Sequence, residues 1–472
     1  MPPKPPITAE QLSALPPEFQ ALVRAIINHY EARIAELEAR IAELERGLTP
    51  QNSSLPPSTQ HPHAKPTPKK SKSKKKRGGQ IGHKKHERPL RPTDECDDVQ
   101  RLKPSECRRC GAKLSGQDRK PWRHQVWELP EIKALVTEYQ LHRLTCRCGE
   151  TTCAALPAGV PRGQSGPRLI AFTSLLMAYY RQSKRRTAEF LTTLLGAPCC
   201  AATTVKMQHQ ATAAVREAYD QLVSQLPAQA HLGGDETPSK EGPSKVWLWT
   251  FVAKRFTVFA LRDSREATAI DELLTDKFRG VVTCDRAKMY WRAGRLQWCW
   301  AHLRRDFQAW IEQKDGVVKR LGYDLARATR KLFEHWGNYR DGTLSRAALQ
   351  RRMAPVKRDV ERYLLRGMSS GKKVLVGTCR ELYKHRPWLW EFARTDGVEP
   401  TNNASERALR HAVIWRKLSF GTQSAAGSRF VETMLTVIET CRQQGRPVCD
   451  YLASALQAHF AQQKAPTLLP RV

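Results

Sequence analysis

The first hydrophobic pattern along the chain is a narrow heptad seam near the N-terminus. Apolar residues recur there at alternating spacings of four and three, and Ala, Glu and Arg fill most positions between them. The seam residues are Val23, Ile27, Tyr30, Ile34, Leu37, Ile41, Leu44 and Leu48. Such a seam on a polar helix predicts a leucine-zipper-like coiled coil over residues 1–48 that joins at least two chains. The alternative is one amphipathic helix packed on the body of the protein.

The hydrophobic pattern disappears over residues 49–91, which are rich in Pro, Ser and Lys. A segment of this composition buries too little surface to offset its chain entropy, so we expect a disordered linker. Residues 61–90 hold eleven Lys and Arg against one Glu. We expect DNA phosphates to be bound without sequence preference by Lys69, Lys70, Lys72, Lys74, Lys75, Lys76 and Arg77. The alternative is a solubilising spacer.

Two cysteine pairs, each followed by Gly, mark residues 92–160. Between them, residues 124–146 alternate apolar and polar like the two strands of a hairpin. Two such turns predict a small zinc-ribbon-like module whose structural Zn²⁺ is held by Cys107, Cys110, Cys146 and Cys148. The second pair is compressed by one residue, so Cys153 and His124 are alternative ligands. The other interpretation is a zinc-free hairpin with unligated thiols.

Residues 161–228 show apolar positions at helical spacing, interrupted at "LGAPCCAATT". A short helix, a Gly-containing turn and a Thr-capped second helix fit a helix-turn-helix that reads DNA. A helical hairpin that serves packing or dimerisation fits the same pattern equally well.

Strand-like runs dominate residues 229–305. In order they are "AHLGGDETP", "KVWLWTFVA" and "RFTVFALRD", a helix at "SREATAIDELLTDKF" with Ser264 as its cap, and then "GVVTCD" and "LQWCWAH". Three strands, a helix and two strands are the opening of an α/β ribonuclease H-like core, a mixed sheet flanked by helices. In that core the first strand is central and lies beside the fourth. Asp235 and Asp285 are therefore expected side by side at one edge of the sheet.

Neighbouring carboxylates repel each other unless a cation holds them, and oxygen ligands suit Mg²⁺ or Mn²⁺. A third acid would complete a two-metal site. Glu406, in the first turn of a capped helix at "TNNASERALR", fits this role. Glu236 is expected on the other side of its strand. His302 in "CWAHLRR" either contacts DNA or the site, or is a capping or core histidine.

The rest of the chain is divided around that third acid. Residues 306–397 form a long helical run, which we interpret as an insertion into the catalytic core. Residues 398–445 are expected to complete the core, and residues 446–472 to form a C-terminal tail.

The charge of the chain narrows the partner class. Lys and Arg outnumber Asp and Glu by 79 to 46, which gives a net charge of +33. Such a field attracts polyanions, of which nucleic acid is the commonest. The N-terminus "MPPKPPITAE" lacks a signal-peptide pattern, and the apolar run at 169–180 is too short to cross a bilayer. Thirteen cysteines without a secretory signal are expected to be reduced, so we expect a cytoplasmic protein with no membrane partner.

These motifs together resemble those of insertion sequence 66 (IS66) family transposases, the TnpC-type members of the bacterial DDE class. The resemblance rests on "NSSLPPS", "RGGQIGH", the cysteine pairs, "GGDET", "TCD", "CWAHLRRDF" and "NNASERALR". It implies a catalytic triad that falls on Asp235, Asp285 and Glu406, a zinc-binding module at 92–155, and an N-terminal zipper. Two departures are the "PSKEG" that follows "GGDET" in place of "GWR", and the compressed second cysteine pair.

The resemblance implies a nucleoid-associated DNA transposase that acts on the inverted terminal repeats of its element, cleaves the strands and joins them to target DNA. Asp235 and Asp285 would bridge the metal ions, and Glu406 would ligate the second. Whether helper proteins of the same element take part is left open. The alternatives are a non-catalytic DNA-binding protein of the same fold and a hydrolytic nuclease.

Overall fold

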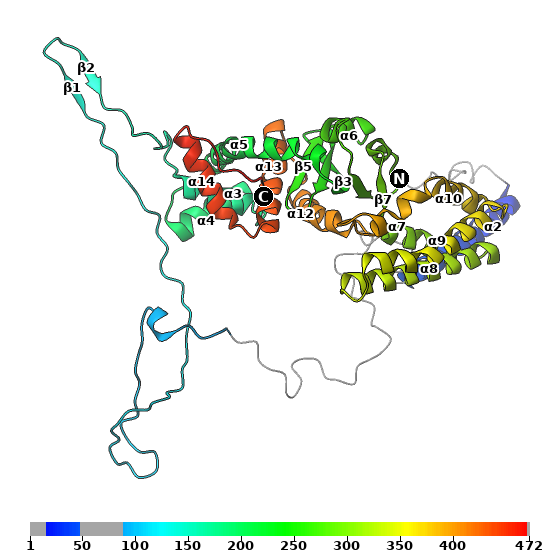
Figure 1. Ribbon diagram of the computed structural model, residues 1–472, viewed down its shortest axis with the longest axis horizontal. Coiled ribbons are helices and arrows are strands. Elements are labelled where there is room, and N and C mark those ends of the chain that lie inside the picture. Colours follow the sequence, from blue (N-terminus) through cyan, green and yellow to red (C-terminus); the bar gives the residue numbers. More distant parts are fainter. Residues whose placement is uncertain (1–15, 48–87, 470–472) are drawn as a thin grey trace.

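A mixed β-sheet lies at the centre of the protein, between two groups of helices (Figure 1). The computed structural model describes residues 16–47 and 88–469, so the predicted basic run from Lys69 to Arg77 lies outside the described residues. Within the described chain the five strands are β3 (His231–Glu241), β4 (Ser244–Val252), β5 (Thr257–Arg262), β6 (Val281–Cys284) and β7 (Leu296–Trp298). Their order across the sheet is β5-β4-β3-β6-β7.

The first strand of this sheet is its central strand. β3 pairs antiparallel with β4 and parallel with β6, and β4 pairs antiparallel with β5. The predicted order of three strands, a helix and two strands is therefore confirmed, with β3 beside the fourth strand. The helix between β5 and β6 is α6 (Ala267–Leu274), whose N-cap residue is Glu266. The prediction that Ser264 caps this helix is wrong, because Ser264 lies three residues before the helix begins and its hydroxyl accepts the N–H of Glu266, the N-cap residue itself.

Helices cover both faces of the sheet. On one face, Leu248 of β4 and Phe259 of β5 pack against α12 (Asn403–Ser419) and α13 (Ala425–Gln443) through Leu409 and Leu435. On the other face, Trp249 packs edge-on against Tyr290 of the 3₁₀ helix η4 (Lys288–Ala293), beside α6. Leu248 and Trp249 face opposite layers because successive strand residues point to opposite sides. Aromatic and branched side chains on alternate positions thus fill two hydrophobic layers.

Further helices extend the body at both ends of the sheet (Figure 1). Beyond β5 lie α3 (Pro167–Ala178), α4 (Lys184–Leu195), α5 (Ala201–Ser224) and α14 (Val448–Phe460). Beyond β7 lie α7 (Trp300–Ile311), α8 (Gly316–Arg340), α9 (Arg346–Met368), α10 (Lys373–Lys384), η5 (Arg386–Leu389) and α11 (Glu391–Arg394). A short 3₁₀ helix, η3 (Leu226–Ala228), leads from α5 into the sheet.

Two expectations about these helices change. The segment expected as a C-terminal tail contains α14, which packs against α3 and buries Tyr451 and Leu452. The N-cap residue of α5 is Cys200 and makes no side-chain capping bond, so the Thr-capped second helix is not observed. Whether α4 and α5 read DNA stays a prediction. Among the described helices, none combines the length and apolar character that crossing a membrane requires.

The predicted coiled-coil segment forms one long helix, α2 (Pro17–Gly47). The seam side chains Tyr30, Ile34 and Leu37 are about half exposed or more, at 63%, 54% and 49%. The side chains of the later seam residues lie outside the described part. The helix is present, Tyr30, Ile34 and Leu37 of its seam are exposed and Val23 and Ile27 are partly buried, and the coiled coil itself stays a prediction.

The cysteine-bearing segment differs from its predicted hairpin. A 3₁₀ turn, η2 (Thr93–Glu95), opens it, and β1 (Arg143–Thr145) pairs with β2 (Thr151–Cys153) around the second cysteine pair. Residues 124–142 form no strand, so the hairpin predicted between the two pairs is wrong. Alternation of apolar residues favours a strand only where one face is buried. Here Leu135 and Val136 are 100% and 92% exposed, because no neighbouring layer covers them.

The N-terminus of α12 touches β3 at two glycines, and this contact positions the candidate site. A Cβ on Gly233 would lie 2.3 Å from the Ser405 Oγ, and a Cβ on Gly234 would lie 2.9 Å from the Tyr290 ring on the opposite face. The Asn402 side-chain amide donates a hydrogen bond to the Gly234 carbonyl (2.6 Å). Only residues without a Cβ allow α12 and η4 to approach the strand so closely from both sides.

We predict that Gly233→Ala destabilises the protein by about 1–3 kcal/mol, because the added methyl group overpacks the α12 contact. Ser405→Ala should be nearly neutral alone, since its buried hydroxyl has no hydrogen-bond partner among the described residues. The double variant Gly233→Ala with Ser405→Ala should recover most of the lost stability, because the added Cβ would lie at an ordinary contact distance of 3.7 Å from the Ser405 Cβ. Urea unfolding measures all three variants.

The matched control is Gly163→Ala, where a Cβ meets nothing within 4 Å. A double variant as unstable as Gly233→Ala alone would contradict the proposed origin of the strain.

Candidate active site

Strand register brings the two predicted aspartates to one edge of the sheet. Gly233 is paired with Thr283 in the parallel ladder between β3 and β6. Asp235 and Asp285 each lie two residues further along, so they continue that register. Side chains two residues apart point to the same face, and Gly233 faces α12. Asp235 therefore lies on the side of the sheet that α12 covers.

Glu406 reaches this edge from the first turn of α12. The loop before the helix is held by the Asn402 N–H, which bonds the Cys299 Sγ (3.2 Å), and by the Pro400 carbonyl, which accepts the Trp300 N–H (2.9 Å). The prediction of a side-chain cap is wrong: Asn402 is the N-cap residue, but its amide bonds Gly234 instead of the helix. The Asn that ordinarily caps a helix here fastens the helix to the central strand.

The acids of this edge act on one another electrostatically. The pKa of Asp235 is raised to about 8, chiefly by burial and then by the charges of Glu236, Asp285 and Glu406. An Asp285 oxygen accepts the Ala287 N–H (2.8 Å), which fixes that carboxylate just after β6. Asp285 and Glu406 are thus near enough for their charges to act on Asp235, and the role of the three acids as a catalytic triad stays a prediction.

Glu236 is directed away from this group of acids. One of its oxygens accepts the Tyr290 hydroxyl hydrogen bond (2.6 Å), and the other pairs with Arg265 (2.5 Å). Burial raises its pKa, whereas these two partners oppose the shift. The expectation that Glu236 points to the other side of its strand agrees with these contacts.

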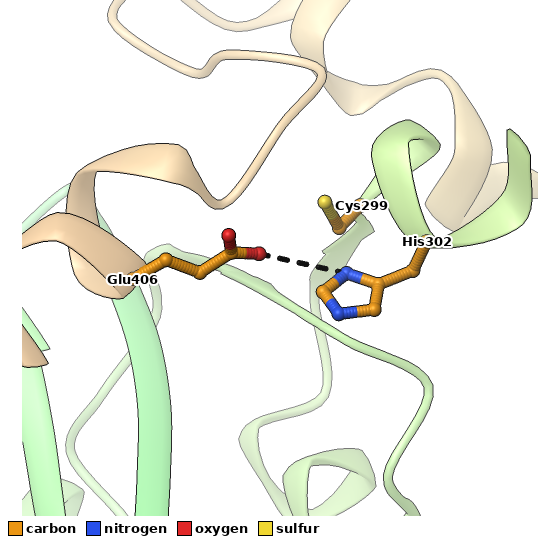
Figure 2. Close-up of side chains that lie close together, drawn as sticks. All are labelled: Cys299, His302 and Glu406. Atoms are coloured by element: carbon orange, nitrogen blue, oxygen red, sulfur yellow. Dashed lines mark ion pairs between the residues drawn. The ribbon is translucent and has the colours of Figure 1, made fainter. Parts of the chain in front are cut away.

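His302 and Cys299 lie next to Glu406 at the start of α7 (Figure 2). The His302 Nδ1 is 3.8 Å from a Glu406 oxygen, and the Cys299 Sγ belongs to the same cluster, with all three donor atoms within 4.8 Å of one another. Burial and the charge of Arg305 lower the pKa of His302, which favours the neutral ring. Burial raises the pKa of the Cys299 thiol. Of the two earlier interpretations of His302, its position favours a residue of the site.

Sequence reasoning missed Cys299, Asn402 and Ser405. The spacing Cys-x-x-His at the junction of a strand and a helix was a usable signal for Cys299, because residues three apart share a helix face. The paired glycines before Asp235 were a signal for close approach of another element. Nothing in the sequence identified α12 as that element.

The donor set of the acidic edge fits hard divalent cations. Carboxylate oxygens are the ligands that Mg²⁺ and Mn²⁺ take, and a cation would remove the repulsion that raises the pKa of Asp235. The Glu406 side chain is 40% exposed, so the edge is open to solvent. Asp235, Asp285 and Glu406 offer oxygen ligands of this kind, but in the described chain their oxygens do not form a group within 4.8 Å of one another, so metal binding by these acids stays a prediction.

Each predicted cysteine pair forms a tight turn suited to binding metal. Gly111 and Gly149 adopt φ values of 72° and 88°, and their N–H groups bond the carbonyls of Cys107 and Cys146 (2.9 Å each). Hydrogen bonds within each turn lower the pKa of Cys107 and Cys146, which favours thiolates.

The structure does not bring the two turns together. In the described part of the chain, Cys299, His302 and Glu406 form the one group of three or more such donors. Apart from the partly buried Gln125, the segment between the turns is exposed, so it supplies little packing that would close a site of four thiolates. Structural zinc sites draw their folding free energy from the metal itself. Zinc binding by Cys107, Cys110, Cys146 and Cys148 stays a prediction.

Known proteins share this organisation in part. The model of the "Transposase IS66 family" matches residues 162–429, and that of a family of unknown function, DUF6444, matches residues 4–89. In Sinorhizobium fredii, the uncharacterized protein y4qI is 25% identical over 270 residues, which are 50% of this chain and 49% of that protein. The uncharacterized protein y4hP of the same organism is 24% identical over 73% of this chain and 70% of its own. The chain spans about half the length of the first of these relatives.

A solved structure, the crystal structure of the Mos1 strand transfer complex, matches 50% of this chain and 80% of its own at 13% identity. Its TM-score of 0.11 is too low to carry an argument about the fold.

The raised pKa of Asp235 predicts how stability depends on pH. An aspartate ionises near about 3.9 in an unfolded chain and near about 8 in this fold. The folded protein binds this proton more tightly, so the stabilisation is complete below the lower value and is lost as pH rises through the higher one. In magnesium-free buffer, Asp235→Asn should flatten this loss and raise the unfolding midpoint at pH 8 by about 2–4 °C per kcal/mol regained.

Calorimetry from pH 5.5 to 8.5 measures the difference. The exposed Asp263→Asn is the control and should follow the wild type. Parallel pH profiles for wild type and Asp235→Asn would contradict the assignment.

Proposed function

The chain belongs to the transposase IS66 family, whose model matches residues 162–429, and we propose that it is a DNA transposase with a ribonuclease H-like catalytic core. It binds the inverted terminal repeats of an insertion sequence, cleaves the DNA strands and joins them to target DNA. One observation supports the proposal: Asp285, just after β6, and Glu406 of α12 both act electrostatically on Asp235 of β3, and all three lie within the residues that the family model matches. Burial, and then the charges of Glu236, Asp285 and Glu406, raise the pKa of Asp235, which supports a site that a bound cation would stabilise.

In this proposal each acid has a separate role. Asp235 and Asp285 hold Mg²⁺ or Mn²⁺ between neighbouring strands, and Glu406 ligates a second ion from α12. Bound there, such ions lower the pKa of an attacking water or 3′ hydroxyl and stabilise the leaving oxygen. Asn402 keeps Glu406 in register with Asp235 through its hydrogen bond to Gly234. A non-catalytic DNA-binding protein would gain nothing from three carboxylates that repel phosphate.

DNA binding is proposed to be shared by several parts of the chain. A net charge of +33 supports broad attraction to phosphates. We assign sequence-independent contacts to the run from Lys69 to Arg77, and DNA positioning to a zinc module closed by the four cysteines of the two turns. The exposed seam residues of α2 support a homodimer or a larger assembly, which would bring both ends of an element together.

We predict that Glu406→Gln lowers cleavage of end-containing DNA by at least about 100-fold, because a neutral amide no longer holds the second metal ion. Folding and end binding should survive, since removal of one negative charge relieves the repulsion on Asp235. Asp235→Asn and Asp285→Asn should behave alike, and a double variant should be hardly worse than either single. Strand cleavage in Mg²⁺ and DNA binding are measured on the same preparations.

The control for this series is Glu399→Gln, which changes an exposed acid just before the same helix. It should keep most of the activity. Cleavage by Glu406→Gln close to the wild-type rate would leave Glu406 as an ordinary acid at a helix start.

A second prediction concerns α2. Ile27→Asp combined with Ile34→Asp should dissociate the assembly, because each substitution places a charge in the apolar seam. Asn28→Asp with Ala35→Asp is a matched control that adds the same charge one position away, outside the seam. Light scattering should show a lower mass for the first pair alone. The same mass for both pairs would remove α2 from the interface.

A further inference from the structure

The first turn of α7 presents two donors, Cys299 and His302, that the proposed reaction does not use (Figure 2). Cys299 is the N-cap residue of α7, and His302 follows three residues later, so both face the same side of the helix start. Glu406 comes from the facing first turn of α12. Sulfur, imidazole nitrogen and carboxylate oxygen thus meet within 4.8 Å.

The spacing of these atoms fits an ion better than direct bonding. The His302 Nδ1 is buried and has no hydrogen-bond partner among the described residues. Its 3.8 Å separation from the Glu406 oxygen is too long for a hydrogen bond. Around a tetrahedral zinc ion, with bonds of about 2.0 Å to nitrogen or oxygen and about 2.3 Å to sulfur, donor atoms lie roughly 3.3–3.6 Å apart. Small side-chain rotations are therefore sufficient for all three atoms to reach one ion.

The surroundings hold the donors in place and leave a way in. The Cys299 side chain is almost fully buried, and its sulfur accepts the Asn402 N–H (3.2 Å), a contact that orients a thiolate ligand. The side chains of His302 and Glu406 are 31% and 40% exposed. An ion is thus able to enter from the solvent side, where a water molecule would complete its coordination.

We propose that Cys299, His302 and Glu406 form a binding site for one Zn²⁺ ion, which shares Glu406 with the acidic edge and is separate from the cysteine turns. A set of one sulfur, one nitrogen and one oxygen suits zinc and is unsuited to Mg²⁺, which takes oxygen ligands. Three protein ligands and one open position leave this site exchangeable, unlike a closed structural site.

The shared ligand gives this site a regulatory consequence, which rests on the proposed transposase activity. Glu406 serves both the zinc site and the acidic edge, and a carboxylate drawn toward His302 is withdrawn from Asp235. Zinc therefore inhibits Mg²⁺-dependent cleavage, and excess Mg²⁺ relieves the inhibition. Thiophilic metal would switch off DNA cleavage without disturbing DNA binding.

Zinc binding itself is tested on the full-length protein without any reference to activity. The protein is dialysed against a series of buffered free Zn²⁺ concentrations, and bound zinc per chain is measured by elemental analysis. The wild type should bind one zinc that Cys299→Ser lacks and that His302→Gln binds at least about 100-fold more weakly, because a lost ligand costs no less than a lost supporting contact. Asp235→Asn should keep this zinc.

Two controls separate this site from other thiols. Cys449→Ser changes a partly buried thiol in α14 and should leave the zinc content unchanged. Cys107→Ser should affect only zinc held by the cysteine turns. Equal zinc binding by wild type, Cys299→Ser and His302→Gln would overturn the proposal, and His302→Gln decides the matter if Cys299→Ser fails to fold.

The inhibition is tested by cleavage in Mg²⁺ with added Zn²⁺. Each variant is compared with its own zinc-free rate, and Cys299→Ser should need at least about tenfold more zinc for half inhibition. Equal sensitivity of wild type and Cys299→Ser would overturn the regulatory role. If no protein cleaves DNA, the proposed transposase activity fails, whereas the zinc measurements above still decide the site.

Discussion

The close contact between α12 and β3 is the constraint on which the candidate site depends. Gly233 and Gly234 leave the central strand bare on both faces, so Ser405 approaches from one side and Tyr290 from the other. The Asn402 amide then joins the helix start to the Gly234 carbonyl. Asp235 follows directly in β3, and Glu406 lies one turn into α12, so their relative position is set by this contact. Two glycines and one asparagine therefore align residues that are 171 positions apart in the sequence.

The contact between α12 and β3 also places the negative charge of Glu406 near Asp235 and Asp285. Arg265 and Tyr290 take up the charge of Glu236 on the opposite face, and no corresponding cation is paired with Asp235 in the described chain. In the metal-free protein, the unfavourable free energy of ionising a buried Asp235 beside other acids appears as its raised pKa. A divalent cation would stabilise the ionised Asp235, so the free energy of unfolding and metal binding are linked through this one carboxylate.

The sequence was sufficient for the order of the strands and for the placing of Asp235 and Asp285 on neighbouring strands, because both follow from local patterns and strand register. Hydrophobic runs of strand length predicted β3 to β7, and each aspartate lies two residues beyond the last pair of the parallel ladder between β3 and β6. The contacts that orient α12 were beyond the sequence, since Asn402 bonds a strand carbonyl where local preference favours a helix cap. The hairpin expected over residues 124–142 failed for a related reason. Alternation predicts a strand only if something covers its apolar face, and no layer of the body does so.

The helical segment from α8 to α11, which we interpret as an insertion, leaves the site undisturbed because the chain departs and returns beside β7. The buried Gln297 side chain accepts the Phe392 N–H (2.8 Å), and the Trp300 indole donates to the Leu389 carbonyl (2.8 Å). The Trp300 N–H bonds Pro400, only six residues before Glu406. β7 and the start of α7 thus hold the two ends of this helical segment next to each other. The Cys299–His302 pair belongs to the same short segment, so the residues that fasten the insertion also place two soft donors next to the third acid. The start of α7, which helps to hold the returning chain, thereby places Cys299 and His302 next to Glu406.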